Sequence, residues 1–260
     1  MTEMVSDAAA DAAVNAYYET EDQATEYMPG AYAREGAAGT RLVIWNIPDP
    51  ELNVVRVDFK PDLREVEAFA QEISATGVPW SIQVRGDVDP ELKKLATRYG
   101  KTDTSTQPLL LWDAESLPAL PAAIPDGAAV RKVSGKDSEV FAATLAAGFG
   151  IPEDIARLLA LPGLLDAPVI TGFLLDLHGE AVATGINVLA GRYAGMYSGS
   201  VPPRRRGNGY YRALVTARLA DAVARGARHS VATNSPMSRP LFESLGFRLA
   251  ATWTHLTPAP

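Results

Sequence analysis

The segment at residues 200–214, SVPPRRRGNGYYRAL, constrains the fold of this chain more than any other stretch. A β-rich run ends at Val201, two prolines break it, and a glycine-containing turn leads into a long helical pattern at 210–226. Gly207 and Gly209 permit left-handed dihedrals and let a ligand approach the backbone closely. The free N–H groups of the first helical turn, with the helix dipole, suit an anion such as a pyrophosphate. A turn in which the glycines serve geometry alone is the alternative, since short glycine motifs are weak evidence.

Strand and helix patterns surround this segment in a regular order. Three β-rich runs joined by short turns predict an antiparallel meander, at 169–177, 180–190 and 193–201. Two helices are expected before the meander, at 136–150 and 152–165. A strand, a short helix and a final strand are expected after the long helix, at 227–234, 239–246 and 247–256.

The first part of the chain repeats this order weakly. Strands are predicted at 41–47, 52–59, 80–86 and 108–113, and helices at 8–34 (one or two), 63–77 and 90–100. The shared order suggests a structural duplication in which the first copy lacks a glycine-rich turn. The segment 114–127 is proline-rich and has no periodicity, which predicts a linker. We therefore expect an N-terminal α/β domain at 1–120 and a second domain at 121–260.

With these elements in place, residues 128–257 resemble the GNAT superfamily of acyl-CoA-dependent N-acetyltransferases. The signature of that family lies between its fourth strand and third helix: Arg or Gln, two residues, Gly, one residue, then Gly or Ala. The residues here that fit it are Arg206, Gly207, Asn208, Gly209 and Tyr210. The last small residue of the signature is replaced by Tyr211, which either points away from the phosphates or crowds them.

The resemblance implies an α/β (α+β) protein with the GNAT fold. Such a fold has a mixed, mostly antiparallel sheet with helices on both faces, and its fourth and fifth strands splay apart. Combined with the weak internal repeat, it implies a tandem arrangement with a degenerate first half.

The resemblance also assigns an acetyl-CoA site and no metal. Backbone amides of the glycine turn are expected to bind the pyrophosphate, and the end of strand four to pair with the pantetheine arm. The residues assigned to this site are Gly199, Ser200, Val201, Arg206, Gly207, Asn208, Gly209, Tyr210, Tyr211 and Asn234.

The proton-transfer groups are less evident. Phe242 stands where the family often has a tyrosine acid, and the run 193–201 lacks the carboxylate that often serves as base. The replacement candidates for catalysis are Ser235, Tyr197 and Ser238, although capping of the last helix is an alternative role for both serines. A thiol with a pKa near 8.5 is a good leaving group, so losing the donor need not abolish acyl transfer.

Composition excludes several other classes of protein. The net charge of −7 argues against a nucleic-acid partner. The chain has no cysteine, its three histidines lack metal-ligand spacing, and it contains no apolar run of membrane-spanning length. The acidic N-terminus lacks the features of a signal peptide. We expect a cytoplasmic protein with no membrane partner, and leave a homo-oligomer open.

Two functions from different classes remain. The first is transfer of an acetyl or other acyl group from acyl-CoA to an amine of a small molecule, peptide or protein. The second is a non-catalytic acyl-CoA sensor or regulatory module, which Phe242 and the absent strand carboxylate favour. A scaffold with its glycine turn blocked by Tyr211 is a third alternative.

Overall fold

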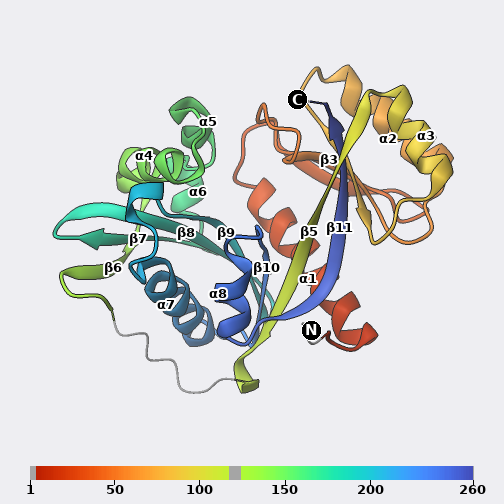
Figure 1. Cartoon of the computed structure of the whole chain (residues 1–260). Helices are drawn as coiled ribbons and strands as arrows, with labels where there is room; N and C mark the ends of the chain where they lie inside the picture. Colours follow the sequence, from red (N-terminus) through yellow and green to blue (C-terminus); the bar gives the residue numbers. More distant parts are fainter. Residues whose placement is uncertain (1–3, 117–123, 260) are drawn as a thin grey trace.

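The computed structural model describes residues 4–116 and 124–259, which fold around one continuous sheet of eleven strands (Figure 1). The strand order is β1-β2-β3-β4-β11-β5-β10-β9-β8-β7-β6. The strands are β1 (Tyr32–Glu35), β2 (Arg41–Ile44), β3 (Asn53–Val57), β4 (Ser81–Arg85), β5 (Lys101–Asp113), β6 (Ala128–Val133), β7 (Ile170–Leu177), β8 (Glu180–Ala190), β9 (Tyr193–Ser200), β10 (His229–Thr233) and β11 (Arg248–Pro258). The α-helices are α1 (Asp7–Thr25), α2 (Leu63–Ala75), α3 (Pro90–Arg98), α4 (Ser138–Phe149), α5 (Glu153–Leu158), α6 (Pro162–Leu165), α7 (Tyr210–Ala224) and α8 (Arg239–Ser244).

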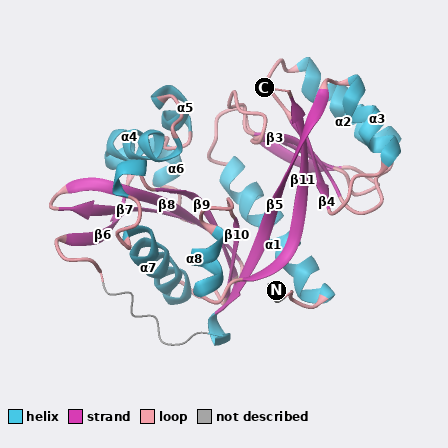
Figure 2. Ribbon diagram, in the orientation of Figure 1, coloured by secondary structure: helices cyan, strands magenta, loops and turns pink. Residues whose placement is uncertain are grey.

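The two halves of the chain exchange their last strands. β5 of the first half pairs antiparallel with β10 of the second half, and β11 of the second half pairs antiparallel with β4 of the first. β5 and β11 also pair with each other along most of their lengths, and they form the long central ribbon of Figure 2. Each half therefore completes the sheet of the other.

The two halves also share one topology. In each, two parallel strands are connected by a helix: β3 and β4 through α2, and β9 and β10 through α7. A short helix then leads to the exchanged strand in both cases. This arrangement agrees with the tandem organisation that the sequence predicts.

The halves differ at the parallel pair. β3 and β4 are paired from Val54 to Val57, which leaves no opening between them. The N-terminus of α2 is closed by the carboxylate of Asp62, which accepts hydrogen bonds from the backbone N–H groups of Arg64 and Glu65 at 2.9 and 3.1 Å. A carboxylate thus occupies the anion-binding end of α2. The corresponding end of α7 begins at Gly209, which has no side chain to cap it.

Helices cover both faces of the sheet. α7 and α8 pack on one face of the second half through a core that includes Leu214, Leu219 and Phe242. α4, α5 and α6 lie on the opposite face over Ile186 and Val188 (Figure 1). α1 packs on this second face across β5, β9, β10 and β11, so it ties the two halves together.

α1 is attached to the first half by ion pairs as well as by its alanine-rich surface. Three of its carboxylates bind arginines of the sheet: Asp11 with Arg85 at 2.6 Å, Glu21 with Arg56 at 2.5 Å, and Asp22 with Arg41 at 2.5 Å. The Glu21–Arg56 pair is buried on both sides. Because an unpaired buried charge is costly, this pair fixes the position of α1.

Some sequence-based boundaries were wrong. The expected helical region 8–34 ends at Thr25 and contains β1, and the expected helix at 152–165 is two short helices, α5 and α6. β6 was not predicted, and β5 begins at Lys101. The domain boundary placed at residue 120 lies outside the described residues. None of the helices in the described part of the chain is long and apolar enough to cross a bilayer.

Candidate active site

β9 and β10 separate after only three residue pairs. They are paired from Tyr193 to Gly195 of β9, and the remainder of β9 diverges. A bulge marks this divergence: Ser198 has a positive φ of 51°, and the register with β8 shifts between Thr184 and Ile186. Bulges with such backbone angles re-aim a strand locally and often lie beside functional sites.

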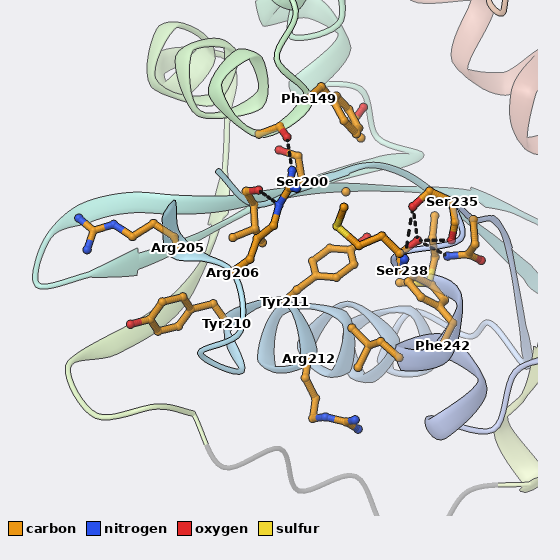
Figure 3. Close-up of a pocket in the computed structure, with 18 of the residues that line it drawn as sticks. Phe149, Ser200, Arg205, Arg206, Tyr210, Tyr211, Arg212, Ser235, Ser238 and Phe242 are labelled. Atoms are coloured by element: carbon orange, nitrogen blue, oxygen red, sulfur yellow. Dashed lines mark hydrogen bonds between the residues drawn. The ribbon is translucent and has the colours of Figure 1, made fainter. Parts of the chain in front are cut away.

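A cavity of about 660 Å³ fills the opening between these strands (Figure 3). It is bordered by the end of β9, the 205–209 turn, the start of α7, the end of β10, and α8. All the residues to which the sequence assigned a binding or catalytic role line this one cavity. Their individual roles stay predictions, but the fold brings them together.

The glycine turn leaves the start of α7 open. Gly207 and Gly209 both have φ of 80°, the left-handed conformation that disfavours other residues. The amide of Asn208 donates to the carbonyls of Arg205 and Arg206 at 3.1 and 3.0 Å and so braces the turn from within. The first-turn N–H groups of α7 therefore face the cavity mouth without a side-chain cap. This geometry fits a pyrophosphate.

The arginines beside the turn already have partners. Arg206 donates to the carbonyl of Val201 at 3.0 Å and to that of Gly148 at 2.9 Å, so it holds the end of β9 against α4. Arg205 pairs with Glu180 at 2.6 Å. These contacts place positive charge near the turn while keeping Arg206 in a structural role.

Tyr211 points away from the turn and toward β9. A Cβ atom at residue 199 would lie 2.1 Å from the Tyr211 hydroxyl oxygen, so glycine there makes room for the ring. Figure 3 shows this ring in the middle of the cavity, near Phe242. This direction favours the expectation that Tyr211 points away from the phosphates, which stays a prediction. Tyr210, half-buried, flanks it at the helix start.

A buried arginine lies under the bulge. Arg218 of α7 donates to the carbonyl of Ile186 at 2.5 Å, to that of Tyr197 at 3.1 Å, and to the side-chain oxygen of Asn187 at 3.0 Å. Burial lowers its pKa to about 10, and its guanidinium lies beside the Tyr211 hydroxyl. Burial raises the pKa of Tyr211, and the charge of Arg218 opposes that rise.

The hydroxyl of Tyr197, a predicted catalytic residue, is engaged in contacts with α1. Its hydroxyl oxygen lies 2.7 Å from the Thr20 side-chain oxygen and donates to the carbonyl of Tyr17 at 3.4 Å. Burial holds its pKa well above the ordinary value. On β9 the neighbouring Ser200, also buried, pairs with the hydroxyl of Thr184 at 2.8 Å.

The two predicted serines lie at the turn before α8. Their hydroxyl oxygens are 3.2 Å apart, and the Ser235 oxygen accepts a bond from the backbone N–H of Ser238 at 3.3 Å. Asn234, buried at the end of β10, donates to the Ser238 hydroxyl at 3.4 Å. Ser238 is the N-cap residue of α8 but makes no side-chain cap hydrogen bond, so these contacts brace the turn before the helix, and both hydroxyls border the cavity.

Four residues that border the cavity carry no sequence signal of a site. They are Glu51 of the β2–β3 loop, Gln107 of β5, Phe149 at the end of α4, and Met237 of the turn before α8. Glu51 and Gln107 come from the first half of the chain, and Gln107 lies on β5, the strand that pairs with β10. Among the described residues, no cluster of three or more His, Asp or Glu side chains could hold a metal ion.

The same fold occurs in solved structures along their whole length. A GCN5-related N-acetyltransferase from Kribbella flavida matches with a TM-score of 0.66 and 19% identity, over 94% of this chain and 96% of that one. Another from Sphaerobacter thermophilus has a TM-score of 0.59 and 14% identity, over 100% and 96%. A tandem GNAT protein from the clavulanic acid biosynthesis pathway has a TM-score of 0.52 and 14% identity, over 96% and 97%.

At these identities the likeness establishes the fold. The sequence itself matches no family profile and no curated protein. The predicted GNAT fold, with a mixed and mostly antiparallel sheet, splayed strands and helices on both faces, is confirmed.

Proposed function

We propose that this protein transfers an acyl group, acetyl in the simplest case, from acyl-CoA to an amine of a small molecule, peptide or protein. The observation that carries the proposal is the uncapped start of α7 at the mouth of the gap between β9 and β10. An anion site next to an opening between strands suits a ligand with a pyrophosphate at one end and an amide-containing arm. The solved structures of the same fold named as N-acetyltransferases support this choice.

The two halves take different roles in this proposal. The second half, 121–260, holds acyl-CoA, with the turn at 207–209 binding its pyrophosphate and the end of β9 pairing with its pantetheine arm. The first half, 1–120, has a closed strand pair and a capped α2, so it borders the acceptor side instead.

Acyl-CoA supplies the thioester, a reactive acyl group with a thiolate leaving group. The acceptor ammonium loses one proton, its nitrogen forms the C–N bond, and the C–S bond breaks. The nitrogen then loses a second proton while the thiolate gains one. The products are an amide, a thiol and one released proton.

Among the described hydroxyls that border the cavity, we select three as candidates to give the thiolate its proton. Tyr211 is the best placed of them because its hydroxyl faces Gly199 of β9 beside the cation of Arg218. That cation stabilises a tyrosinate formed when the proton leaves. Ser235 and Ser238 are the other two, and their hydroxyls bond to each other and to the turn before α8.

A non-catalytic acyl-CoA sensor is the second candidate. It is favoured by Phe242, whose ring is buried and carries no hydroxyl, and by the lack of any carboxylate on β9. The sensor would bind acyl-CoA in the same cavity and release no thiol.

One pair of assays separates the two functions. A thermal-shift titration with acetyl-CoA, CoA and a longer acyl-CoA tests binding, and mass spectrometry of an amine panel after incubation with acetyl-CoA tests transfer. The enzyme gives both stabilisation and acetylated product, whereas the sensor gives stabilisation alone. Binding of none of the three compounds would leave only a scaffold.

A further inference from the structure

The charged residues that border the cavity come from two different parts of the chain. Among the described residues that border it, Glu51 is the single carboxylate, and the cations are Arg205, Arg206 and Arg212. All three arginines belong to the glycine turn and the first turn of α7. Glu51 instead comes from the loop between β2 and β3 of the first half. The positive charge of the cavity therefore accompanies the glycine turn, and the first half contributes its carboxylate.

The first-half residues reach the cavity from the face that α1 covers. Leu109 and Leu111 of β5 pack in the core under α1, so Gln107, two residues earlier, lies on that same face. Leu52, next to Glu51, packs with Tyr197 in the core under α4. Glu51 also approaches α1 itself: burial, with Glu51 among the nearby charges, raises the pKa of Tyr17.

Three second-half residues meet the cavity from the opposite face. Met196, Tyr211 and Phe242 belong to the core under α7 and α8. The cavity at the opening between β9 and β10 is thus bordered by the glycine turn and α7 and also by first-half side chains.

The carboxylate of Glu51 is free to bind a ligand. Within the described residues this carboxylate has no hydrogen-bond or ion-pair partner. The backbone N–H of Glu51 donates to the side-chain oxygen of Asp49. The side chain is open to solvent through the cavity, yet surrounding protein and the charge of Asp49 raise the pKa of its carboxyl. A cationic ligand would offset both the partial desolvation of the carboxylate and its repulsion by Asp49.

Two apolar side chains stand exposed at this same cavity. The fraction of Phe149 exposed to solvent is 50% and that of Met237 is 69%, which is high for residues of this size. Both line the cavity, Phe149 from the end of α4 and Met237 from the turn before α8. Exposed apolar groups at a cavity rim suit an apolar ligand surface.

From these observations we infer that the acceptor is a primary ammonium cation carried on an apolar body, with Glu51 of the first half as its counter-ion and Phe149 and Met237 as its apolar contacts. The inference rests on the proposed function, whose acceptor it specifies. It gives the first half a direct part in substrate recognition.

The test uses a dead-end complex, so that it does not depend on turnover. Protein saturated with CoA is titrated by calorimetry with phenethylamine and, separately, with its neutral analogue phenethyl alcohol. The variant is Glu51→Gln, which keeps the shape and removes the charge. The control is Glu26→Gln, which removes an exposed carboxylate after α1 outside the cavity.

We expect Glu51→Gln to weaken phenethylamine binding at least tenfold and to change CoA affinity less than twofold. Glu26→Gln should change neither, and phenethyl alcohol should bind wild type and Glu51→Gln equally weakly. Phe149→Ala should reduce the ratio of the affinity for phenethylamine to the affinity for methylamine. Equal phenethylamine affinity in wild type and Glu51→Gln, or no preference of wild type for the amine over the alcohol, overturns the inference. Acyl transfer by wild type would then still stand, because product formation is measured separately.

Discussion

The aromatic rings of Tyr211 and Phe242 lie side by side in the candidate site, with their centroids 6.1 Å apart. Phe242 is also packed edge-on against Phe247 at 4.9 Å, which leaves it buried. The resemblance to the GNAT superfamily leads us to expect a tyrosine at the position of Phe242 and a small residue at that of Tyr211. The hydroxyl missing from α8 is therefore present on the neighbouring ring, contributed by α7.

This pairing predicts that Tyr211→Phe lowers the rate of acyl transfer and leaves CoA affinity unchanged. The expected loss is on the order of a hundredfold in kcat, the contribution of a positioned acid. Tyr210→Phe is the matched control, because it removes the adjacent hydroxyl. Steady-state kinetics with acetyl-CoA measure the effect, and Phe242→Tyr in the Tyr211→Phe background should recover part of it. An unchanged kcat in Tyr211→Phe would return the donor role to Ser235, Ser238 or water.

The glycine turn predicts a loss of CoA binding when Gly209 becomes valine. The φ of 80° strains any β-branched residue, and the new side chain would stand at the opening of α7. We expect at least a tenfold weaker Kd by calorimetry, equivalent to about 1.4 kcal/mol. Gly226→Val is the control, since it carries a comparable backbone penalty with φ of 97° just beyond the other end of α7. Equal losses of CoA affinity in the two variants would mean that the substitutions act on folding and not on the glycine turn.

The buried pair of Glu21 and Arg56 predicts a large cost when only one partner is removed. Burial opposes the charge of Arg56, but Glu21 holds its pKa above the ordinary value. Glu21→Gln should therefore lower the free energy of unfolding by about 3–5 kcal/mol, measured by urea denaturation. The double variant Glu21→Leu/Arg56→Met should be less destabilised than the single one. If the double variant loses more free energy of unfolding than the single variant, then packing and not the ion pair fixes the position of α1.

The lowered pKa of His255 leads us to expect a decline of stability in mild acid. Burial and the charge of Arg56 lower its pKa to about 4, and its ring contacts Gln83 at 3.1 Å. The unfolded chain takes up this proton near pH 6.5 and the folded protein only near 4, so the unfolded state binds more protons between these values. The stabilising contribution is complete above pH 6.5 and is lost progressively down to pH 4.

Between pH 7.5 and 5.0 this single group should remove about 2 kcal/mol from the free energy of unfolding. His255→Gln cannot take up the proton, so its stability should fall less over the same interval by that amount. Urea denaturation of both proteins at the two pH values measures the difference. Equal falls in the free energy of unfolding of the two proteins would show that the pKa of His255 does not differ between the folded and unfolded states.

The parts of this protein that sequence could predict are the local ones. The turn at 207–209 and the meander before it depend on neighbouring residues, because glycine, proline and alternation act within a few positions. One exception in this region is Tyr211, because the direction of its side chain depends on the space beside Gly199 of β9.

The strand exchange could not be predicted because it depends on pairing between distant segments. The first half of β5, KTDTSTQ, is largely exposed and lacks apolar alternation, so only its partner β11 reveals it as a strand. Glu51 was missed for the same reason. A glutamate in a polar turn carries no signal by itself, and the fold alone places it at a cavity lined by the second half.

The most direct test of the central claim is product formation by the wild-type protein. Purified protein is incubated with acetyl-CoA and phenethylamine, free thiol is followed with time, and the amine is examined by mass spectrometry. We expect one N-acetylated amine for each thiol released, with the Gly209→Val variant impaired and the Gly226→Val control active. Saturable binding of acetyl-CoA without acetylation of this or any amine in a broad panel would contradict it and leave the acyl-CoA sensor in its place.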